Sequence, residues 1–414
     1  MANIQERKNK DGKIISYSIR VHKGRDLNGK QLKPYAMTFK VEPTWSERKI
    51  QAELKKAVVL FEEQCKYGIV ADNKQTFEKY AQYVLELKQR TGVKHRTIVR
   101  YKELLERINP AIGHFKLADL KPQHLNSFYE QLSKDGMNKS TGGKLSNKTI
   151  IEHHRLIRTI LSQAEKEMLV QYNSASKATP PKMDKKEANY IEIEDIDRIL
   201  EYAKSESLKW QVAINLLVFT GCRRGEIMGL KWNKIDFQNN LITIDTNLLY
   251  STEKGIYQDT PKTEQSKRKL NVPSSVIELI KTYKREQNLK RLQLGSAWFD
   301  TGFVFTQENG GPMHPDTLTD YCTKFTAKYN KKIEKHNKET GAKIPLLPHI
   351  TPHAFRHSQA SMLILNGLDC ATVSKRLGHA KISTTTDIYS HIMQKADESA
   401  STALENILLK KNAQ

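Results

Sequence analysis

Alternating apolar and polar residues near the start of the chain predict two β-strands. Residues 15–21 and 35–41 place apolar side chains at every second position, the period of a half-buried strand, and Asn28-Gly29 between them is a turn signal. A helix is predicted to begin near Ser46 and to fade around Tyr67. The polar face of these strands would carry Arg20, His22, Thr38 and Lys40. A basic ribbon of this kind can lie in a DNA groove, but a solvated edge hairpin explains the same pattern.

Apolar residues recur at helical spacing between residues 74 and 172 and predict an all-helical segment. The stripes lie at 77–84, 98–108, 125–132 and 150–164, and we interpret them as core. Ser146 is the predicted cap of the fourth helix. The other faces of that helix carry Lys148, His153, Arg155 and Arg158, which can follow DNA phosphates or serve as ordinary solubilising charge.

Residues 173–189 contain small residues, a proline pair and charged residues, and predict a linker. From residue 190 onward the pattern is mixed. Helical stripes lead to a turn at Thr220-Gly221, short strands are predicted around Leu241–Asp245 and Arg268–Val272, and helices occupy the remainder. The chain is therefore predicted to be mainly helical, with small β elements in its first and last segments.

Two short helices near the C-terminal end place polar side chains close together. Thr351 and Pro352 form a helix-start signature, which puts His353 and Arg356 on one face beside the unpaired N–H groups of the first turn. A second helix is predicted from near Asp369 to Leu377, ending at Gly378 and leaving His379 just beyond it. Tyr389 follows ten positions later. These side chains could converge on one anion, since a helix N-terminus favours phosphate.

The charge balance indicates a polyanionic partner. The 414 residues include 68 Lys and Arg against 46 Asp and Glu, a net charge of +22, which favours nucleic acid or an anionic membrane surface. Membrane association is disfavoured because apolar runs such as residues 216–219 are too short to span a bilayer. The first residues show no apolar signal-peptide core, and the four cysteines lack C-x-x-C spacing. We therefore expect a cytoplasmic, reduced protein.

Further candidate chemistry lies in the middle of the last segment. Arg223 follows a glycine break with Glu226 three positions beyond it, and an arginine held by a carboxylate is a preset fork for phosphate oxygens. Arg224 competes for the same role, but adjacent helical residues point about 100° apart, and the motif spacing favours Arg223. Lys262 sits in a turn before a strand. An exposed Arg–Glu pair and a charged hairpin tip are the ordinary explanations of these features.

The ordered set of Arg223-x-x-Glu226, Lys262, His353-x-x-Arg356, Gly378-His379 and Tyr389 resembles that of the tyrosine recombinases. The likeness is to the integrases of temperate phages and conjugative transposons, and it covers the whole chain. It implies a three-stranded-sheet arm-binding domain at 1–70, an all-α core-binding domain at 74–172 and a mixed α/β catalytic domain at 190–395, after the linker at 173–189. Residues 396–414 would form a helix that docks on a neighbouring subunit, although packing on their own domain is the simpler alternative.

The resemblance also implies a role for each motif residue. Tyr389 would attack the scissile phosphate and form a 3′-phosphotyrosyl link, while Lys262 protonates the departing 5′-oxygen. Arg223 and Arg356 would clamp the phosphate, His353 and His379 would hydrogen-bond it and manage protons, and Glu226 would brace Arg223. The implied partners are double-stranded DNA at the element ends and target site, a tetramer of this chain on DNA, and an accessory excision factor.

No cofactor, metal or ATP is expected for this chemistry. The sequence has no G-x-x-x-x-G-K-[ST] motif and no acidic cluster suited to Mg²⁺. His353 and His357 are four apart, as in a zinc-binding pair, but Ala354 stands where a metalloprotease has Glu. Two alternatives remain at this stage, a type IB topoisomerase and a non-catalytic DNA-binding regulator. The complete residue set disfavours the regulator.

Overall fold

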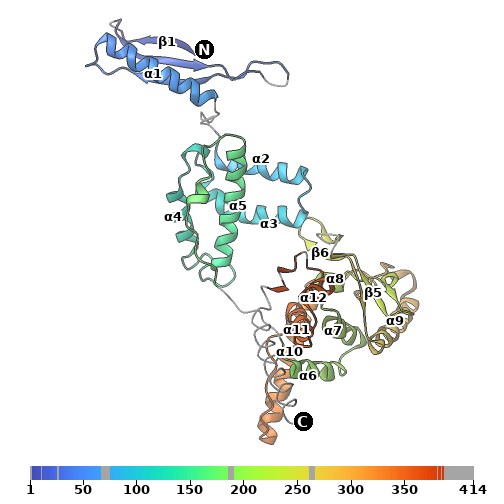
Figure 1. Ribbon diagram of the computed structural model, residues 1–414. Coiled ribbons are helices and arrows are strands. Elements are labelled where there is room, and N and C mark those ends of the chain that lie inside the picture. Colours follow the sequence, from blue (N-terminus) through green and yellow to red (C-terminus); the bar gives the residue numbers. More distant parts are fainter. Residues whose placement is uncertain are drawn as a thin grey trace, which may run out of the picture. The chain divides into compact units, whose positions relative to one another are not determined.

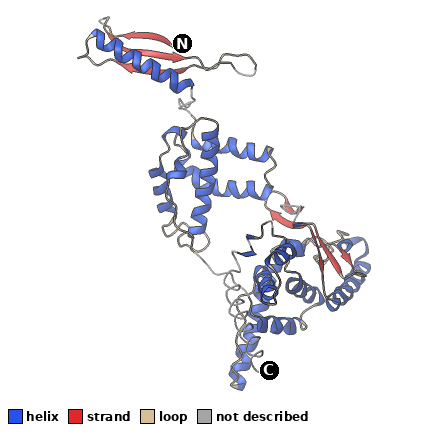
Figure 2. Cartoon of the chain, viewed as in Figure 1, coloured by secondary structure: helices blue, strands red, loops and turns tan. Residues whose placement is uncertain are grey.

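The structure is a computed structural model that describes residues 2–10, 12–25, 28–66, 75–184, 191–260, 266–379, 381–383 and 385–386. The chain divides into two compact units, Met1–Lys185 and Lys186–Gln414. Figure 1 labels the elements in chain order, and Figure 2 shows that helices dominate, with strands confined to the N-terminal segment and to one part of the second unit. The predicted fold class, mainly helical with small β elements, is confirmed.

The chain begins with an antiparallel sheet in the order β1-β2-β3, formed by β1 (Asn3–Lys8), β2 (Ile14–Val21) and β3 (Tyr35–Lys40). Helix α1 (Glu47–Lys66) supplies Leu54 and Phe61 to a small core with Tyr17 and Ile19. The alternation correctly predicts β2 and β3. It does not reveal β1, whose side chains are all exposed and largely polar. Ile15 is half exposed, so its expected burial was wrong, because it lies near the end of β2.

The sheet face opposite this core is polar. The register pairs Ser18 with Thr38 and Ser16 with Lys40, which puts Arg20, Thr38 and Lys40 on the same face, all of them exposed. His22 lies just beyond β2, where its Nδ1 accepts a hydrogen bond of 3.0 Å from Gln31. The four residues of this sheet that were predicted to contact DNA therefore lie on one of its faces and at its edge.

The next segment is a helical bundle built from α2 (Phe77–Arg90), α3 (His95–Ile108), α4 (Pro122–Leu132) and α5 (Asn147–Lys166). Three short turns complete it, a π turn at Asn109–Gly113 and 3-10 turns at Leu117–Asp119 and Ser174–Lys177. The predicted stripes form its core, for example Phe77, Leu125 and Ile150. Ser146 caps α5 as predicted, since its Oγ accepts from the Thr149 amide at 3.3 Å.

Helix α5 presents three of its four predicted basic side chains in the expected way and buries the fourth. Lys148, Arg155 and Arg158 are exposed. His153 is fully buried, so its assignment to the outer face was wrong. Its Nδ1 donates to the Thr149 carbonyl at 2.8 Å and its ring lies edge-on against Phe128, while its buried Nε2 has no hydrogen-bond partner among the described residues.

The packed bundle continues into the range predicted as linker. Asn173 and Ala175 are buried, and the Asn173 side chain donates to the Arg158 carbonyl at 2.9 Å and to Ser162 at 2.8 Å. The backbone of the chain that leaves α5 is therefore fixed for at least one more turn.

The second unit combines seven α-helices with two small sheets in its described part. The helices are α6 (Ile193–Ala203), α7 (Leu208–Thr220), α8 (Arg224–Met228), α9 (Ser274–Leu294), α10 (Thr317–Thr340), α11 (Pro352–Leu365) and α12 (Cys370–Leu377). The strands are β4 (Ile235–Asp236), β5 (Leu241–Ile244) and β8 (Arg268–Asn271) in one antiparallel sheet, and β6 (Asn247–Ser251) with β7 (Gly255–Asp259) in a hairpin. Helix α7 is apolar on all sides because it packs against α6, α9 and α11.

Two asparagines on α10 fasten the chain that returns toward α11. The Asn330 side chain donates to the Leu347 carbonyl at 2.9 Å and accepts from the Leu347 amide at 2.8 Å. Asn337, two turns further along, makes the same pair of bonds with Ile344 at 2.8 and 3.1 Å. The extended segment before Thr351 therefore has a fixed course, although it pairs with no strand among the described residues.

No helix in the described ranges is long and apolar enough to cross a membrane.

Candidate active site

The start of α11 carries two of the predicted site residues. Thr351 caps the helix, as predicted, because its Oγ1 accepts from the Ala354 amide at 3.1 Å, and Pro352 occupies the first turn. The cap leaves the other N–H groups of the first turn beside His353 and Arg356. Partial desolvation, then the charges of Arg356 and Arg223, lower the pKa of His353, so the ring is neutral at pH 7.

Arg356 is a buried cation with an unused donor. It is only 3% exposed, and its Nη1 donates to the Gly221 carbonyl at 2.9 Å. Its Nη2 is buried and has no hydrogen-bond partner among the described residues. Burial, followed by the nearby Arg223, lowers the pKa of Arg356 to about 10, which still leaves it protonated at pH 7. A desolvated guanidinium with an open N–H calls for an anion.

Arg223 stands at the start of α8 and is held from two sides. Glu226 accepts from the Arg223 backbone amide at 3.0 Å and from its Nη1 at 2.8 Å. The Nη2 donates to the Gly378 carbonyl at 3.1 Å. Arg224 turns elsewhere, to an ion pair with Asp316 and a 3.4 Å contact with Thr319. The geometry therefore directs Arg223, and not Arg224, toward Arg356.

The end of α12 supplies the carbonyl that Arg223 contacts and the histidine that follows it. The helix begins and ends where predicted. Asp369 caps it by accepting from the amides of Ala371 and Thr372, and Gly378 ends it in the left-handed region at φ 69°. Burial, followed by Arg356 and Arg223, lowers the pKa of His379 to about 3. Its Nδ1 lies 2.8 Å from the hydroxyl of the buried Thr385.

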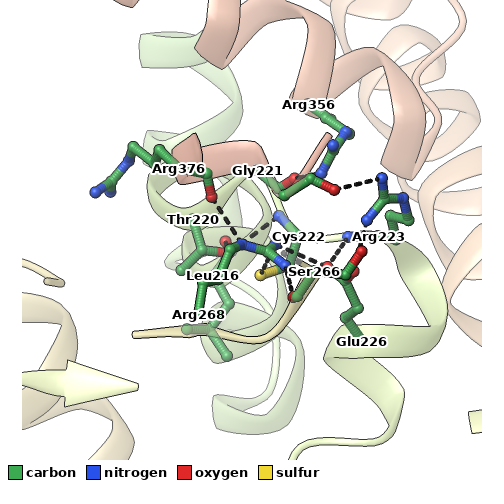
Figure 3. A network of polar contacts seen from close by, with 11 residues as sticks. Leu216, Thr220, Gly221, Cys222, Arg223, Glu226, Ser266, Arg268, Arg356 and Arg376 are labelled. Atoms are coloured by element: carbon green, nitrogen blue, oxygen red, sulfur yellow. Dashed lines mark hydrogen bonds and ion pairs between the residues drawn. The ribbon is translucent and has the colours of Figure 1, made fainter. Parts of the chain in front are cut away.

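Glu226 binds a second arginine in addition to Arg223 (Figure 3). Arg268 of β8 donates to Glu226 at 2.8 Å, and the two side chains are 5% and 4% exposed. Burial alone would raise the pKa of the Glu226 carboxyl, but Arg268 and then Arg223 bring it down to about 2. One carboxylate neutralises at most one of the three guanidinium charges, so the cluster keeps a positive potential suited to an anion.

A cavity of about 440 Å³ opens beside this cluster. Its lining includes Arg223, Arg224, Thr351 and His353, together with residues 247–249 of β6. Cationic groups, a helix N-terminus and a concave surface thus coincide, and together they can hold one phosphate and its flanking nucleotides.

Some predicted site residues lie outside the described residues. These are the nucleophile candidate Tyr389, the acid candidate Lys262 and the tail at 396–414. Arg20, His22, Thr38, Lys40, Arg155 and Arg158 lie in the first unit. Within the described ranges, no group of three His, Cys, Asp or Glu side chains is arranged to hold a metal ion.

Sequence reasoning missed two side chains of the site. Arg268 was included only as the first residue of a predicted strand, and Thr385 was given no role in the site. Two of its partners, Glu226 and the Arg376 carbonyl, lie 42 and 108 positions away, so local spacing gives no signal for them. The hydroxyl of Thr385 could have been suspected only from its place six residues after His379.

Comparisons with known proteins place the chain in a family. Residues 189–396, which are 208 of the 414, match the sequence model described as the phage integrase family, and residues 76–133 match the phage integrase N-terminal SAM-like domain. A "tyrosine recombinase XerC-like" protein of Caldanaerobacter subterraneus subsp. tengcongensis is 28% identical over 97% of this chain and 98% of its own length. The transposase of transposon Tn916 from Enterococcus faecalis is 31% identical over 48% of this chain and 46% of its own length.

Among solved structures, the integrase of transposon Tn1549 in complex with transposon right-end DNA aligns with a TM-score of 0.63 and 21% identity. The alignment covers 80% of this chain and 99% of that one. At this identity the likeness shows that the two chains share a fold.

Proposed function

Because the chain belongs to the phage integrase family, and is thus a tyrosine-type site-specific recombinase of mobile elements, we propose that Tyr389 is its nucleophile. The phenolate oxygen attacks the scissile phosphorus, a 3′-phosphotyrosyl bond forms, and the bond to the 5′-oxygen breaks. Lys262 gives the 5′-oxygen its proton. Attack by a second 5′-hydroxyl reverses these steps and joins a new pair of strands.

The open Nη2 of the buried Arg356 carries this proposal. The displacement concentrates negative charge on the non-bridging phosphate oxygens, and preset guanidinium donors in a water-poor site stabilise such charge without reorganising. Arg223 and Arg356 are each anchored by a carbonyl at 3.1 and 2.9 Å, which leaves other N–H groups free to turn to the phosphate. His353 contributes from the same helix start.

The state of His379 follows from its neighbour. The ring is neutral at pH 7, since its pKa is about 3. If its Nε2–H is to donate to a phosphate oxygen, Nδ1 must accept, and the Thr385 hydroxyl must then be the donor across their 2.8 Å contact. Because a hydroxyl can donate as well as accept, the Thr385 contact is compatible with the tautomer that can hydrogen-bond the phosphate.

The free energy of the broken phosphodiester is retained in the protein–DNA ester, so resealing needs no nucleotide hydrolysis. The charges of this chain stabilise the transition state in our scheme. Tyr389 passes its proton to a nearby base, and the surrounding positive field stabilises the phenolate that results. A free tyrosine with a pKa of about 10 would attack poorly at neutral pH.

The first unit would supply the binding to DNA. We propose that the polar face of the N-terminal sheet, with Arg20, His22, Thr38 and Lys40, contacts arm sites, and that Arg155 and Arg158 on α5 follow phosphates of the core site. The domain division would be 1–70, 74–172 and 190–395, with a linker at 173–189. The Tn1549 integrase was solved on transposon-end DNA, which supports element ends as the substrate here.

The proposed assembly is a tetramer on paired DNA sites, with residues 396–414 of each subunit docked on a neighbour and an accessory factor that directs excision. The protein would work in the bacterial cytoplasm, associated with the nucleoid while bound to DNA. Family membership favours this recombinase over the type IB topoisomerase and the non-catalytic regulator.

A nicked duplex that loses a short strand end after cleavage tests the proposed chemistry. The wild-type protein should become covalently attached to the 3′ end of the cleaved strand, and Tyr389→Phe should abolish the adduct while keeping DNA affinity. Absence of any wild-type adduct on the element's own ends would overturn the proposal. Relaxation of supercoils by a monomer, without strand exchange between two sites, would instead indicate the topoisomerase.

A further inference from the structure

A buried arginine on β8 directs its donors into the protein. The Nε of Arg268 donates to the Arg376 carbonyl at 2.7 Å, and Nη1 donates to the Ser266 carbonyl at 3.1 Å. Nη2 donates to Glu226 at 2.8 Å and contacts the Cys222 sulfur at 3.4 Å. With 5% of its side chain exposed, Arg268 has these protein partners in place of DNA. It can act on the reaction only through other residues.

Arg268 binds one of the two groups that hold Arg223, the Glu226 carboxylate (Figure 3), and packs against the turn that carries the other, the Gly378 carbonyl. The carboxylate that accepts from Arg223 Nη1 is bound on its other oxygen by Arg268. The carbonyl that accepts from Arg223 Nη2 belongs to Gly378, in the turn directly after the Arg376 carbonyl that Arg268 binds. A Cβ on Gly378 would lie only 2.9 Å from Arg268 Nη1, so Arg268 packs directly against this turn.

The end of α12 is tied to β8 in the opposite direction as well. The Arg376 side chain donates to the Phe219 carbonyl at 2.8 Å and to the Asn271 carbonyl at 3.3 Å, at the ends of α7 and β8. Each of the two arginines thus binds the backbone of the strand or helix that bears the other. This exchange fixes the position of the Gly378 carbonyl relative to Glu226.

We propose that Arg268 is a positioning residue for strand transfer. It sets the orientation of the Arg223 guanidinium by binding one of its acceptors, Glu226, and by fixing the turn that carries the other, the Gly378 carbonyl. The inference rests on the proposed function of Arg223. Without Arg268, the buried carboxylate of Glu226 has one cationic partner left, and Arg223 turns toward it and away from the phosphate. The Gly378 carbonyl, no longer packed on a guanidinium, loses its fixed place at the same time.

The test compares cleavage of a normal duplex with cleavage of a duplex whose scissile phosphate is a methylphosphonate. The methylphosphonate carries no charge, so it has little need of a charge clamp. We expect Arg268→Met to slow adduct formation on the phosphodiester by about 10- to 100-fold, as for groups that orient the ligands of a reactive centre. On the methylphosphonate, the same variant should lose no more than about threefold, the order at which one weakened hydrogen bond acts.

A double-variant cycle separates positioning from general damage. If Arg268 acts through Arg223, the double variant Arg223→Ala/Arg268→Met should cleave the phosphodiester no more slowly than Arg223→Ala alone. Multiplied losses in the double variant would overturn the inference, and so would equal losses of Arg268→Met on both substrates.

Gln287→Met is the matched control for lost stability. Gln287 is buried on α9, where it accepts from Trp232 and donates to Val304 and Thr306, and its replacement removes buried hydrogen bonds in the same unit. It should lower the unfolding temperature without changing the ratio of the two cleavage rates. A shifted ratio in this control would overturn the inference.

Arg268→Lys provides the same comparison if the methionine variant does not fold. Lysine keeps a charge beside Glu226 but cannot also reach the Arg376 carbonyl, so an intermediate loss confined to the phosphodiester is expected. The wild-type protein distinguishes failure of the proposed function from failure of the inference about Arg268. If it forms no adduct, the proposed function fails; if it does and the Arg268 variants cleave both substrates equally well, only the present inference fails.

Discussion

The basic residues of this chain follow two designs. Arg223, Arg268 and Arg356 lie in the second unit with carboxylate or carbonyl partners at 2.7 to 3.1 Å, and Arg268 and Arg356 are almost wholly buried. Arg20, Lys40, Arg155 and Arg158 lie in the first unit with exposed side chains on one sheet face and one helix. Buried cations act by geometry, because every bond is fixed and water is excluded. Exposed cations act mainly through their charge, and the strength of that attraction depends on the salt concentration because salt screens exposed charges.

This difference determines what a substitution of each kind of basic residue is expected to do. A buried charge that loses its partner costs several kilocalories per mole, and a charge-preserving replacement does not repair it. An exposed charge contributes modestly, and its contribution depends on salt. The predictions below, from the largest expected effect to the smallest, compare the two designs.

Removing the shared carboxylate should have the largest effect. Glu226→Gln leaves Arg268 buried with a neutral partner, which should lower the free energy of unfolding by about 3–5 kcal/mol. Glu308→Gln is the matched control, since Glu308 also has two cationic partners, Lys209 and Lys290, but is 75% exposed. Its replacement should cost less than about 1 kcal/mol in chemical denaturation. Equal costs for the two variants would contradict the comparison.

Keeping the charge while removing the fork should nearly abolish the chemistry. In Arg356→Lys one nitrogen cannot bind both the Gly221 carbonyl and a phosphate, so adduct formation should slow by about 10²–10³-fold. DNA affinity should stay within a few-fold of wild type in a filter-binding assay. Arg291→Lys, an exposed residue paired with Asp300 at 2.9 Å, should leave the cleavage rate unchanged. A cleavage rate near wild type for Arg356→Lys would mean that charge alone is sufficient there.

Removing two exposed cations should change the salt dependence of binding instead. If Arg20 and Lys40 each contact one phosphate, Arg20→Ala/Lys40→Ala should reduce the slope of log K against log salt by about 1.8. Adduct formation on a core-site duplex without arm sites should not change. Lys55→Ala/Lys56→Ala removes the same charge from α1 and should leave the slope for arm-site DNA as it is. A core-site defect in the first variant would contradict this division of roles.

Acid should destabilise the second unit through two half-buried histidines. Burial, with neighbouring positive charge, lowers the pKa of His357 to about 4 and that of His379 to about 3. As pH falls from about 6.5, the unfolded chain takes up protons that the folded chain refuses, so stability falls between about pH 6.5 and pH 4.

Between pH 7 and pH 5 we expect the unfolding midpoint of the wild type to fall by roughly 2–4 °C more than that of His357→Gln. The exposed His336→Gln on α10 serves as the control and should follow the wild type. Identical acid responses of wild type and His357→Gln would show that His357 carries no part of the effect. Glu226 does not interfere, since its own loss of stability lies below about pH 4.5, toward its pKa of about 2.

The local signals in the sequence predicted the helix starts and ends of the site well. Thr351, Asp369 and Gly378 each satisfy backbone groups within a few residues, so spacing alone places them. The pairing of Arg223 with Glu226 spans three positions and was equally visible. Such contacts depend on neighbours in the chain, which is why pattern and structure agree there.

Contacts between distant segments could not be predicted in the same way. The pattern around Arg268 predicts only a short strand. The role of Arg268 depends on Glu226 and Arg376, which the fold brings to it from distant parts of the chain. The burial of His153 depends on Phe128 of another helix. Strand β1 was missed because its sequence, NIQERK, has little apolar alternation and is held by its pairing with β2.

The two asparagine clamps on α10 have a practical consequence for labelling the protein. The backbone reverses at Gly341, in the left-handed region at φ 71°. Asn337 and Asn330 bind Ile344 and Leu347, which lie between this reversal and Thr351. A fluorophore attachment sequence or affinity tag inserted at that reversal should not displace Thr351, because both asparagine clamps hold the chain between the insertion and Thr351. Such a handle would allow single complexes to be followed through cutting and rejoining with the chemistry undisturbed.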